Sequence, residues 1–181
     1  MEQGRIVIVT GSPGTGKSTV SALLAEASSL AWSVHMHTDD FYHYLSKGAA
    51  APHLPGADRH NRGVIEALSA AAERFARGGY ETVVDGIVGP WFLSPWRKLA
   101  RAGCEVHYIV LRASREETLR RALARAKLSR TVNTELVDTM WAQFLGLGEW
   151  ERNVLDTTDL SVRETVAAVQ ARIADGTALL A

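Results

Sequence analysis

The chain has 181 residues, of which 46% are hydrophobic and 22% charged, which is the composition of an ordinary globular domain. Its 20 basic and 20 acidic residues balance, so a broad basic surface for nucleic acid or for an anionic membrane is not expected. The single cysteine, Cys104, cannot form an internal disulfide, no apolar run is long enough to span a membrane, and Met1–Arg5 leads into an expected strand and not into a signal sequence. A cytoplasmic location is therefore predicted.

Strand-like apolar runs alternate with helix-like periodic runs along the chain. Strands are expected at residues 5–10, 32–37, 81–85, 105–111 and 153–157, and the first two should be buried. Helices are expected at about residues 17–27, 40–48, 58–77, 94–103, 114–125, 133–145 and 161–176, with a loop at 49–56. This alternation predicts an α/β fold, a parallel sheet flanked by helices on both faces, as one domain over residues 1–181.

The segment GSPGTGKS, residues 11–18, matches the pattern G-x-x-x-x-G-K-[ST] between an expected strand and an expected helix. Its glycines allow backbone angles that direct consecutive N–H groups at one anion, and the helix N-terminus adds positive charge. Lys17 can reach the terminal phosphates, and the Ser18 hydroxyl can ligate Mg²⁺. The predicted phosphate cradle comprises Gly11, Ser12, Pro13, Gly14, Thr15, Gly16, Lys17, Ser18 and Thr19. A glycine-rich turn that merely carries a lysine is the disfavoured alternative.

Acidic residues end the next two strands. Because ligands of open α/β sheets lie outside the carboxyl ends of the strands, Asp39, Asp40 and Asp85 should converge with the cradle on one crevice. Asp85 is predicted to hold Mg²⁺ directly or through water, although it could simply precede a turn at Gly86. For the acidic pair the alternative is helix capping by Thr38 or Asp39. Adjacent residues of an extended chain point in opposite directions, so one carboxylate at most should face the γ-phosphate.

Five segments together resemble the P-loop kinases of small molecules with the adenylate-kinase-like fold. They are GSPGTGKST, HTDDF, VVDG, LR before a basic helix, and VLDTT, and they cover essentially the whole chain. Within that group the sequence is most similar to chloramphenicol phosphotransferase, gluconate kinases, zeta-toxin kinases and bacterial proteins provisionally called cytidylate kinases or phosphotransferases. The resemblance implies a P-loop NTPase fold with a five-stranded parallel sheet, and a mobile basic lid at about residues 121–135.

The resemblance also implies roles for individual residues. Asp39 stands where the family has the residue that orients or deprotonates the acceptor hydroxyl. Arg121 and Arg125 stand in the lid, where arginines stabilise the charge of the transferring phosphoryl group. Thr157 lies in the loop that borders the adenine. For Arg121 an ion pair with Glu117 on a solvated helix face is the alternative, and a similar pair is expected between Glu116 and Arg120.

Aromatic and polar residues cluster after the second and third strands. Such a mixture suits a sugar, a nucleoside or an aromatic natural product, although packing is the alternative for each aromatic residue. The predicted substrate-site residues are Asp39, Asp40, Phe41, Arg62 and Trp91.

The predicted function is an ATP- and Mg²⁺-dependent kinase that phosphorylates a hydroxyl of a small molecule, as a monomer or homodimer. A nucleoside monophosphate kinase is the alternative, and it would need a second anion site, for which Arg59, Arg62 and Arg97 are candidates. A regulator driven by nucleotide hydrolysis is a third hypothesis, for which 181 residues leave little room.

Overall fold

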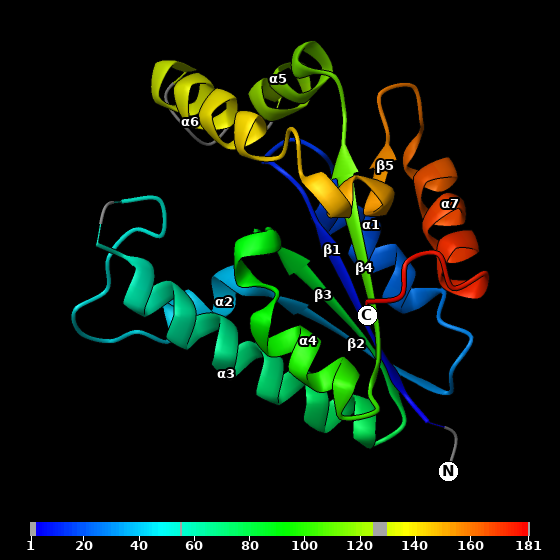
Figure 1. Cartoon of the computed structure of the whole chain (residues 1–181). Helices are drawn as coiled ribbons and strands as arrows, with labels where there is room; N and C mark the ends of the chain where they lie inside the picture. Colours follow the sequence, from blue (N-terminus) through cyan, green and yellow to red (C-terminus); the bar gives the residue numbers. More distant parts are fainter. Residues whose placement is uncertain (1–2, 55, 125–129, 181) are drawn as a thin grey trace.

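The computed structural model describes residues 3–54, 56–124 and 130–180, and of residues 130–133 the backbone only (Figure 1). The described strands form one parallel sheet, as predicted, and their order is β2-β3-β1-β4-β5. The strands are β1 (Arg5–Thr10), β2 (Trp32–His37), β3 (Tyr80–Gly86), β4 (Glu105–Arg112) and β5 (Val154–Asp156).

The helices follow the predicted alternation. They are α1 (Lys17–Glu26), α2 (Thr38–His43), α3 (Asp58–Arg77), α4 (Ser94–Arg101), α5 (Arg115–Ala124), α6 (Arg130–Gln143) and α7 (Val162–Ala174), with short 3₁₀ turns η1 (Pro90–Phe92) and η2 (Gly148–Asn153). Helix α2 ends at His43, earlier than predicted, and α6 begins before the predicted Asn133. None of the described helices combines the length and hydrophobicity that crossing a bilayer requires.

Two apolar layers hold the helices against the sheet. Successive residues of β1 alternate between the layers: Ile6 and Ile8 pack in one, and Val7 and Val9 in the other. Helices α3 and α4 cover the first face, and α1 and α7 cover the second (Figure 1). Because both faces are covered, β1 reads as a continuous apolar run, the usual signature of a parallel strand.

The prediction that the second strand is buried is wrong. Strand β2 lies at the edge of the sheet, and Met36 alone of its six residues is buried. Strand β2 pairs with β3 alone, and Trp32 at its start is 55% exposed. The exposed edge nevertheless matters for the site, because the pairing of β2 with β3 sets His37 beside Asp85.

Gly86, at the end of β3, packs closely against Thr38, the first residue of α2. Gly86 has φ of 142°, and a Cβ atom at this position would overlap the buried side chain of Thr38. Only glycine permits this approach, since an added Cβ would push α2 away from the sheet. The contact therefore fixes the first turn of α2, which carries Asp39, relative to Asp85.

Candidate active site

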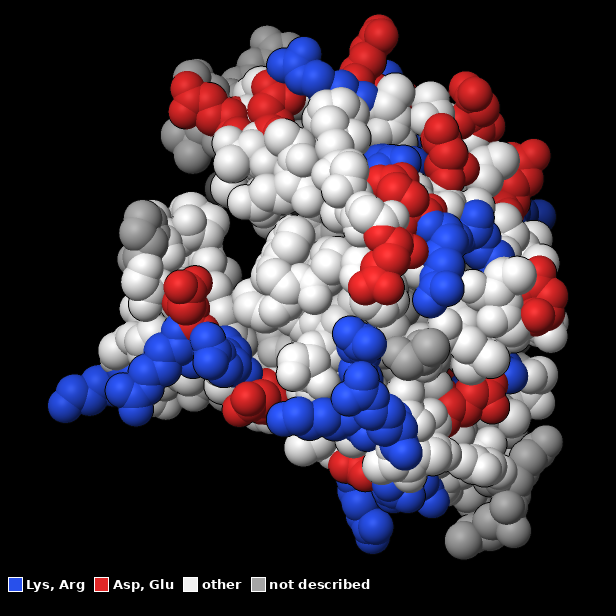
Figure 2. Space-filling model, in the orientation of Figure 1, with Lys and Arg blue, Asp and Glu red and all other residues white. Residues whose placement is uncertain are grey.

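A cleft of about 2310 Å³ runs from the phosphate cradle past α2 and along α3, between α4 and α6. It lies at the carboxyl ends of the central strands, where open α/β sheets bind ligands. Figure 2 shows it as a hollow between α6 above and the start of α3 below. Of the predicted site residues, the cleft is lined by Pro13, Gly14, Lys17, Ser18, Asp39, Arg62 and Trp91.

The cradle has the backbone geometry that its glycines predict. Gly11, Gly14 and Gly16 have φ of 147°, 91° and 86°. A Cβ on Gly11 would collide with the Leu111 carbonyl oxygen, and one on Gly14 with the Thr118 carbonyl. The loop therefore needs glycine both for its dihedral angles and for its close approach to neighbouring chain. Gly16 leads directly into α1, whose N-terminus faces the same space.

The carboxylate of Asp85 is fully buried at the end of β3. Its Oδ1 lies 3.0 Å from His35 Nε2. Its Oδ2 lies 3.7 Å from His37 Nε2 and has no hydrogen-bond partner within the described part of the chain. Burial by itself would raise the pKa of Asp85, but the His35 hydrogen bond, the Ser18 hydroxyl and the nearby imidazole of His37 outweigh it and hold that pKa below its ordinary value.

The orphan oxygen of Asp85 and the Ser18 hydroxyl fit a Mg²⁺ ion that also binds nucleotide phosphates. Ser18 Oγ lies 3.4 Å from His37 Nε2, which links it to the same cluster. No cluster of three His, Cys, Asp or Glu side chains in the described ranges could hold a metal alone. A metal here would therefore complete its shell with phosphate oxygens and water, which is how Mg²⁺ usually binds beside nucleotides.

The two histidines of β2 are the contacts that sequence reasoning missed. Their i, i+2 spacing places His35 and His37 on the same face of an edge strand. The pattern His-x-His at the end of a strand was a usable signal, but only the β2–β3 register shows that both reach Asp85.

The N-cap of α2 is His37, and neither Thr38 nor Asp39, the alternative considered for the acidic pair, takes that position. His37 Nδ1 accepts a hydrogen bond from the Asp39 backbone N–H at 3.0 Å. Nδ1 is therefore unprotonated in this arrangement, and the proton of a neutral ring lies on Nε2, which faces Ser18 and Asp85. The capping imidazole also frees the Asp39 side chain from a capping role.

Asp39 and Asp40 are not equivalent. Asp39 lines the cleft, its side chain is 67% exposed, and its Oδ2 lies 3.8 Å from His37 Nδ1. Asp40 lies outside the described lining, in the first turn of α2, where the helix dipole favours a negative charge. Of the two carboxylates, Asp39 alone therefore lies in the described lining, and which of them faces the phosphates stays a prediction.

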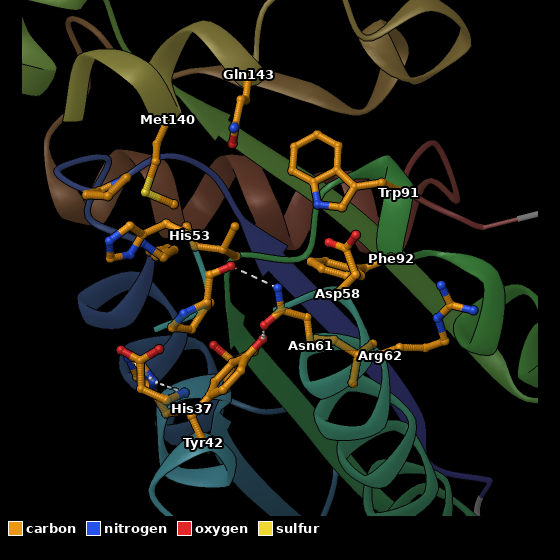
Figure 3. Close-up of a pocket in the computed structure, with 18 of the residues that line it drawn as sticks. His37, Tyr42, His53, Asp58, Asn61, Arg62, Trp91, Phe92, Met140 and Gln143 are labelled. Atoms are coloured by element: carbon orange, nitrogen blue, oxygen red, sulfur yellow. Dashed lines mark hydrogen bonds and ion pairs between the residues drawn. The ribbon is translucent and has the colours of Figure 1, made fainter. Parts of the chain in front are cut away.

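The far half of the cleft combines aromatic and polar side chains (Figure 3). Trp91, 49% exposed, lines it, and its ring centroid lies 5.7 Å from that of Phe144. Burial and the charge of Asp39 raise the pKa of Tyr42 to about 12. Phe41, in contrast, packs against the core and lies edge-to-face on Tyr44, so the structure does not bring it into the described lining.

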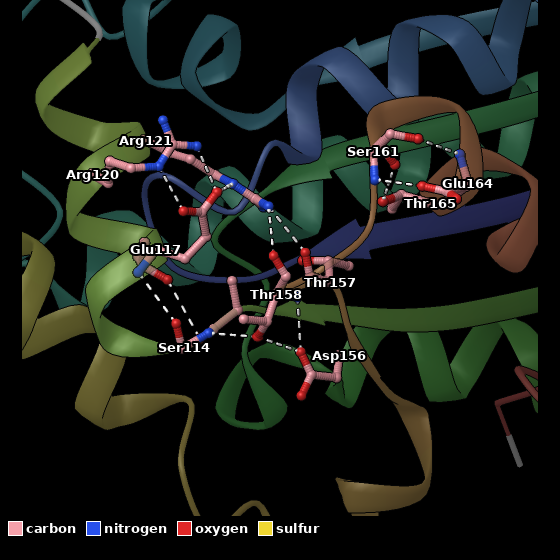
Figure 4. A network of polar contacts seen from close by, with 12 residues as sticks. Ser114, Glu117, Arg120, Arg121, Asp156, Thr157, Thr158, Ser161, Glu164 and Thr165 are labelled. Atoms are coloured by element: carbon pink, nitrogen blue, oxygen red, sulfur yellow. Dashed lines mark hydrogen bonds and ion pairs between the residues drawn. The ribbon is translucent and has the colours of Figure 1, made fainter.

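Arg121, predicted for the lid, is engaged in the described conformation (Figure 4). Its Nε donates to Glu117 at 2.6 Å, and its Nη2 donates to the Thr157 carbonyl at 3.0 Å. Hydrogen bonds from Arg120 and Arg121 lower the pKa of Glu117 to about 2. Arg121 could therefore reach a phosphoryl group only after leaving Glu117 and the carbonyls of Thr157 and Thr158. Arg125 lies outside the described residues.

One other expectation about this region is corrected, and Ser114 and Glu117, which have the spacing of a helix capping box, form only part of one. Arg120 pairs with Glu117, three residues earlier, and not with Glu116. The Glu117 N–H donates to Ser114 Oγ, but the Glu117 carboxylate is taken by the two arginines, and the Ser114 N–H donates to Thr158 Oγ1 instead. The capping box is thus only half formed, because a guanidinium is the stronger partner for a carboxylate. Thr157 is buried and outside the described cleft lining, so its predicted contact with adenine stays a prediction.

Comparisons with known proteins concern the family and the fold of the chain. A family model described as an AAA domain matches residues 7–139. A search of curated proteins found no match. The tunicamycin resistance protein of Deinococcus radiodurans is 20% identical with a TM-score of 0.69, each chain covered to 99%. The APS kinase of Mycobacterium tuberculosis is 19% identical with a TM-score of 0.70, covering 97% of this chain and 99% of that one.

A gluconokinase from Sinorhizobium meliloti is 19% identical with a TM-score of 0.68, covering 98% of this chain and 95% of the other. At such identities the likeness concerns the fold, which is that of the P-loop kinases.

Proposed function

The chain belongs to the AAA domain family that matches residues 7–139, and on that premise we propose that it is a kinase that transfers the γ-phosphate of ATP to a hydroxyl of a small molecule. The observation that carries the proposal is the continuity of the cleft. Lys17 and Ser18 of the cradle, Asp39, and the aromatic far half line one connected space. A phosphate donor at one end and an acceptor at the other would meet beside Asp39.

The reaction needs few covalent steps from the protein. The acceptor oxygen attacks the γ-phosphorus, the bond from that phosphorus to the bridging oxygen of ADP breaks, and the acceptor proton passes to Asp39. A carboxylate is a weak base, but a loose transition state demands orientation more than early deprotonation. The cradle N–H groups and Lys17 would stabilise charge on the phosphate oxygens.

Ser18 and Asp85 are the residues that would hold Mg²⁺, whose charge would further offset that of the phosphates. His35 would orient the Asp85 carboxylate through the 3.0 Å contact with Oδ1, leaving Oδ2 toward the metal. Arg121 is proposed to join the transferring group after release from Glu117.

A nucleoside monophosphate kinase has less support. Of the candidate second-anion residues only Arg62 lines the described cleft. The Arg97 guanidinium lies instead over the Trp150 ring, 5.8 Å from its centroid. An acceptor phosphate would therefore meet one arginine where such a site normally gathers several.

The test is ADP release from ATP and Mg²⁺ with a panel of sugars, nucleosides and hydroxylated antibiotics. We expect turnover that depends on one class of alcohol, and Asp39→Asn should lower kcat by about 100-fold or more. Asp40→Asn is the matched control, since it removes a neighbouring carboxylate outside the lining and should leave kcat near the wild-type value. An Asp39→Asn variant that turns over at the wild-type rate would refute the base assignment.

Other outcomes would redirect the assignment. Phosphorylation of a mononucleotide and of no alcohol would favour the nucleotide kinase. ATP turnover that no small acceptor changes, but that a protein partner does, would favour a regulator.

A further inference from the structure

The polarity of the acceptor half of the cleft carries an inference about the substrate class, which rests on the function proposed above. We propose that this half selects a hydroxyl-rich molecule that donates hydrogen bonds, is neutral or carries an amine, and has no negative charge. Three groups carry the argument: the Asp39 carboxylate, the Tyr42 phenol oxygen and the Asp58 carboxylate, all of which line the cleft.

Asn61 determines whether the Tyr42 hydroxyl donates or accepts hydrogen bonds in the cleft. Asn61 is 5% exposed, and its Nδ2 donates to the Pro52 carbonyl at 2.8 Å. A carbonyl can only accept, so the amide cannot be reversed without setting two oxygens against each other. Asn61 Oδ1 must then accept from the Tyr42 hydroxyl, 3.0 Å away (Figure 3).

The single phenolic proton of Tyr42 is thereby committed to Asn61. What remains toward the cleft is an oxygen with a free lone pair, which accepts hydrogen bonds. With its pKa raised to about 12, the phenol keeps its proton throughout the neutral range, so this polarity does not change there. Tyr42 follows Asp39 by three residues on α2, so both face the same side of that helix.

Asp58 adds a second carboxylate at the first turn of α3. Figure 3 shows it directed between Trp91 and Phe92. Among the described residues none forms a hydrogen bond or ion pair with its side chain. An ionised carboxylate accepts hydrogen bonds only, so it adds to the same polarity as Tyr42. The rings of Trp91 and Phe92, which line the same cleft, offer faces to sugar C–H groups or to a cation.

Arg62, the arginine of the described cleft lining, does not offset the negative charge of Asp39 and Asp58. Arg62 lies one turn after Asp58, but Figure 3 shows its side chain extended toward α4, away from Tyr42. Lys98, the lysine of the described lining that lies outside the cradle, is on α4 itself. An anionic acceptor would therefore bring its charge against Asp39 and Asp58, whereas hydroxyl and ammonium donors would satisfy them.

The test compares glucose with two pyranoses that each differ from it at one carbon. Glucosamine carries an amine at C2, and glucuronate carries a carboxylate at C6. Each is titrated into the ¹⁵N-labelled full chain, and dissociation constants are taken from shifts of α2 and α3 signals. We expect glucosamine to bind about fivefold more tightly than glucose, and glucuronate about fivefold more weakly. Equal or tighter binding of glucuronate than of glucose, or no shift by any sugar, would overturn the proposal.

Two variants with matched controls separate the contributions of Asp58 and Tyr42 to sugar binding. Asp58→Asn, which keeps one acceptor oxygen but loses the charge, should remove the advantage of glucosamine over glucose, whereas Asp40→Asn should preserve it. Tyr42→Phe should weaken glucose and glucosamine alike, whereas Tyr44→Phe, at a residue 72% exposed and outside the described lining, should not. An advantage of glucosamine that survives in Asp58→Asn would contradict the role of this carboxylate.

Phosphate transfer is measured separately, by ³¹P NMR with ATP and Mg²⁺. Binding in the expected order without transfer would refute the proposed kinase activity and leave the inference intact. Transfer that favours glucuronate would refute the inference and leave the kinase activity standing.

Discussion

Asn61→Ala is the substitution that best tests how the acceptor side is held together. The amide joins three segments: its own helix α3, Tyr42 of α2 and Pro52 of the connecting loop. Alanine keeps the helix, since its helix propensity is the highest, and removes both hydrogen bonds. Any effect therefore reports the loss of these two contacts.

The size of the effect follows from the burial of the partners. A net hydrogen bond contributes about 0.5–1.5 kcal/mol. The Pro52 carbonyl belongs to an exposed residue and regains water, whereas the half-buried Tyr42 hydroxyl does so less completely. We therefore expect a loss of about 2 kcal/mol at most, which for a chain of this length lowers Tm by about 4–8 °C. Glucose should bind several-fold more weakly, because the Tyr42 hydroxyl is no longer held.

Thermal unfolding followed by circular dichroism measures the stability, and sugar titration measures the binding. Asn153→Ala is the matched control: Asn153 is also buried, its Nδ2 donates to the Tyr108 carbonyl at 2.9 Å, and it lies outside the described lining of the cleft. It should lower Tm without weakening sugar binding. If both variants lower Tm alike and neither weakens sugar binding, Asn61 stabilises the fold but does not position Tyr42.

Three further predictions concern the nucleotide side. Lys17→Met should lower ATP turnover by about 100-fold or more, while Lys47→Met, at an exposed lysine outside the described lining of the cleft, leaves turnover intact; equal losses would refute the role of the cradle lysine. Because the folded pKa of Asp85 lies below its ordinary value of 3.8, the stability it contributes is present at neutral pH and is lost as the pH falls through the folded pKa. Acid unfolding of Asp85→Asn should therefore show a shallower decline below about pH 4, and identical slopes would contradict this. Gly86→Ala should lower Tm and turnover together, whereas Gly63→Ala, with open space around it on α3, should raise Tm slightly.

Much of the fold could be predicted from local pattern. The long helix expected at residues 58–77 has the same bounds as α3. An apolar stripe along the helix and Gly78 directly after its last residue indicate it from a short stretch of sequence. The cradle could be predicted for the same reason, since its glycines encode the dihedral angles of their own loop. The expected parallel sheet followed from the alternation of apolar strands and periodic helices.

The sequence alone thus determined the elements and the phosphate cradle, whose requirements lie within a few consecutive residues. Tertiary structure decided which side chains meet across those elements. Strand order placed β2 at the edge, register set His35 and His37 on Asp85, and packing turned Phe41 toward the core. It also committed the Tyr42 proton to Asn61, 19 residues away. Such pairings depend on how the whole chain packs, and a local window of sequence contains no record of it.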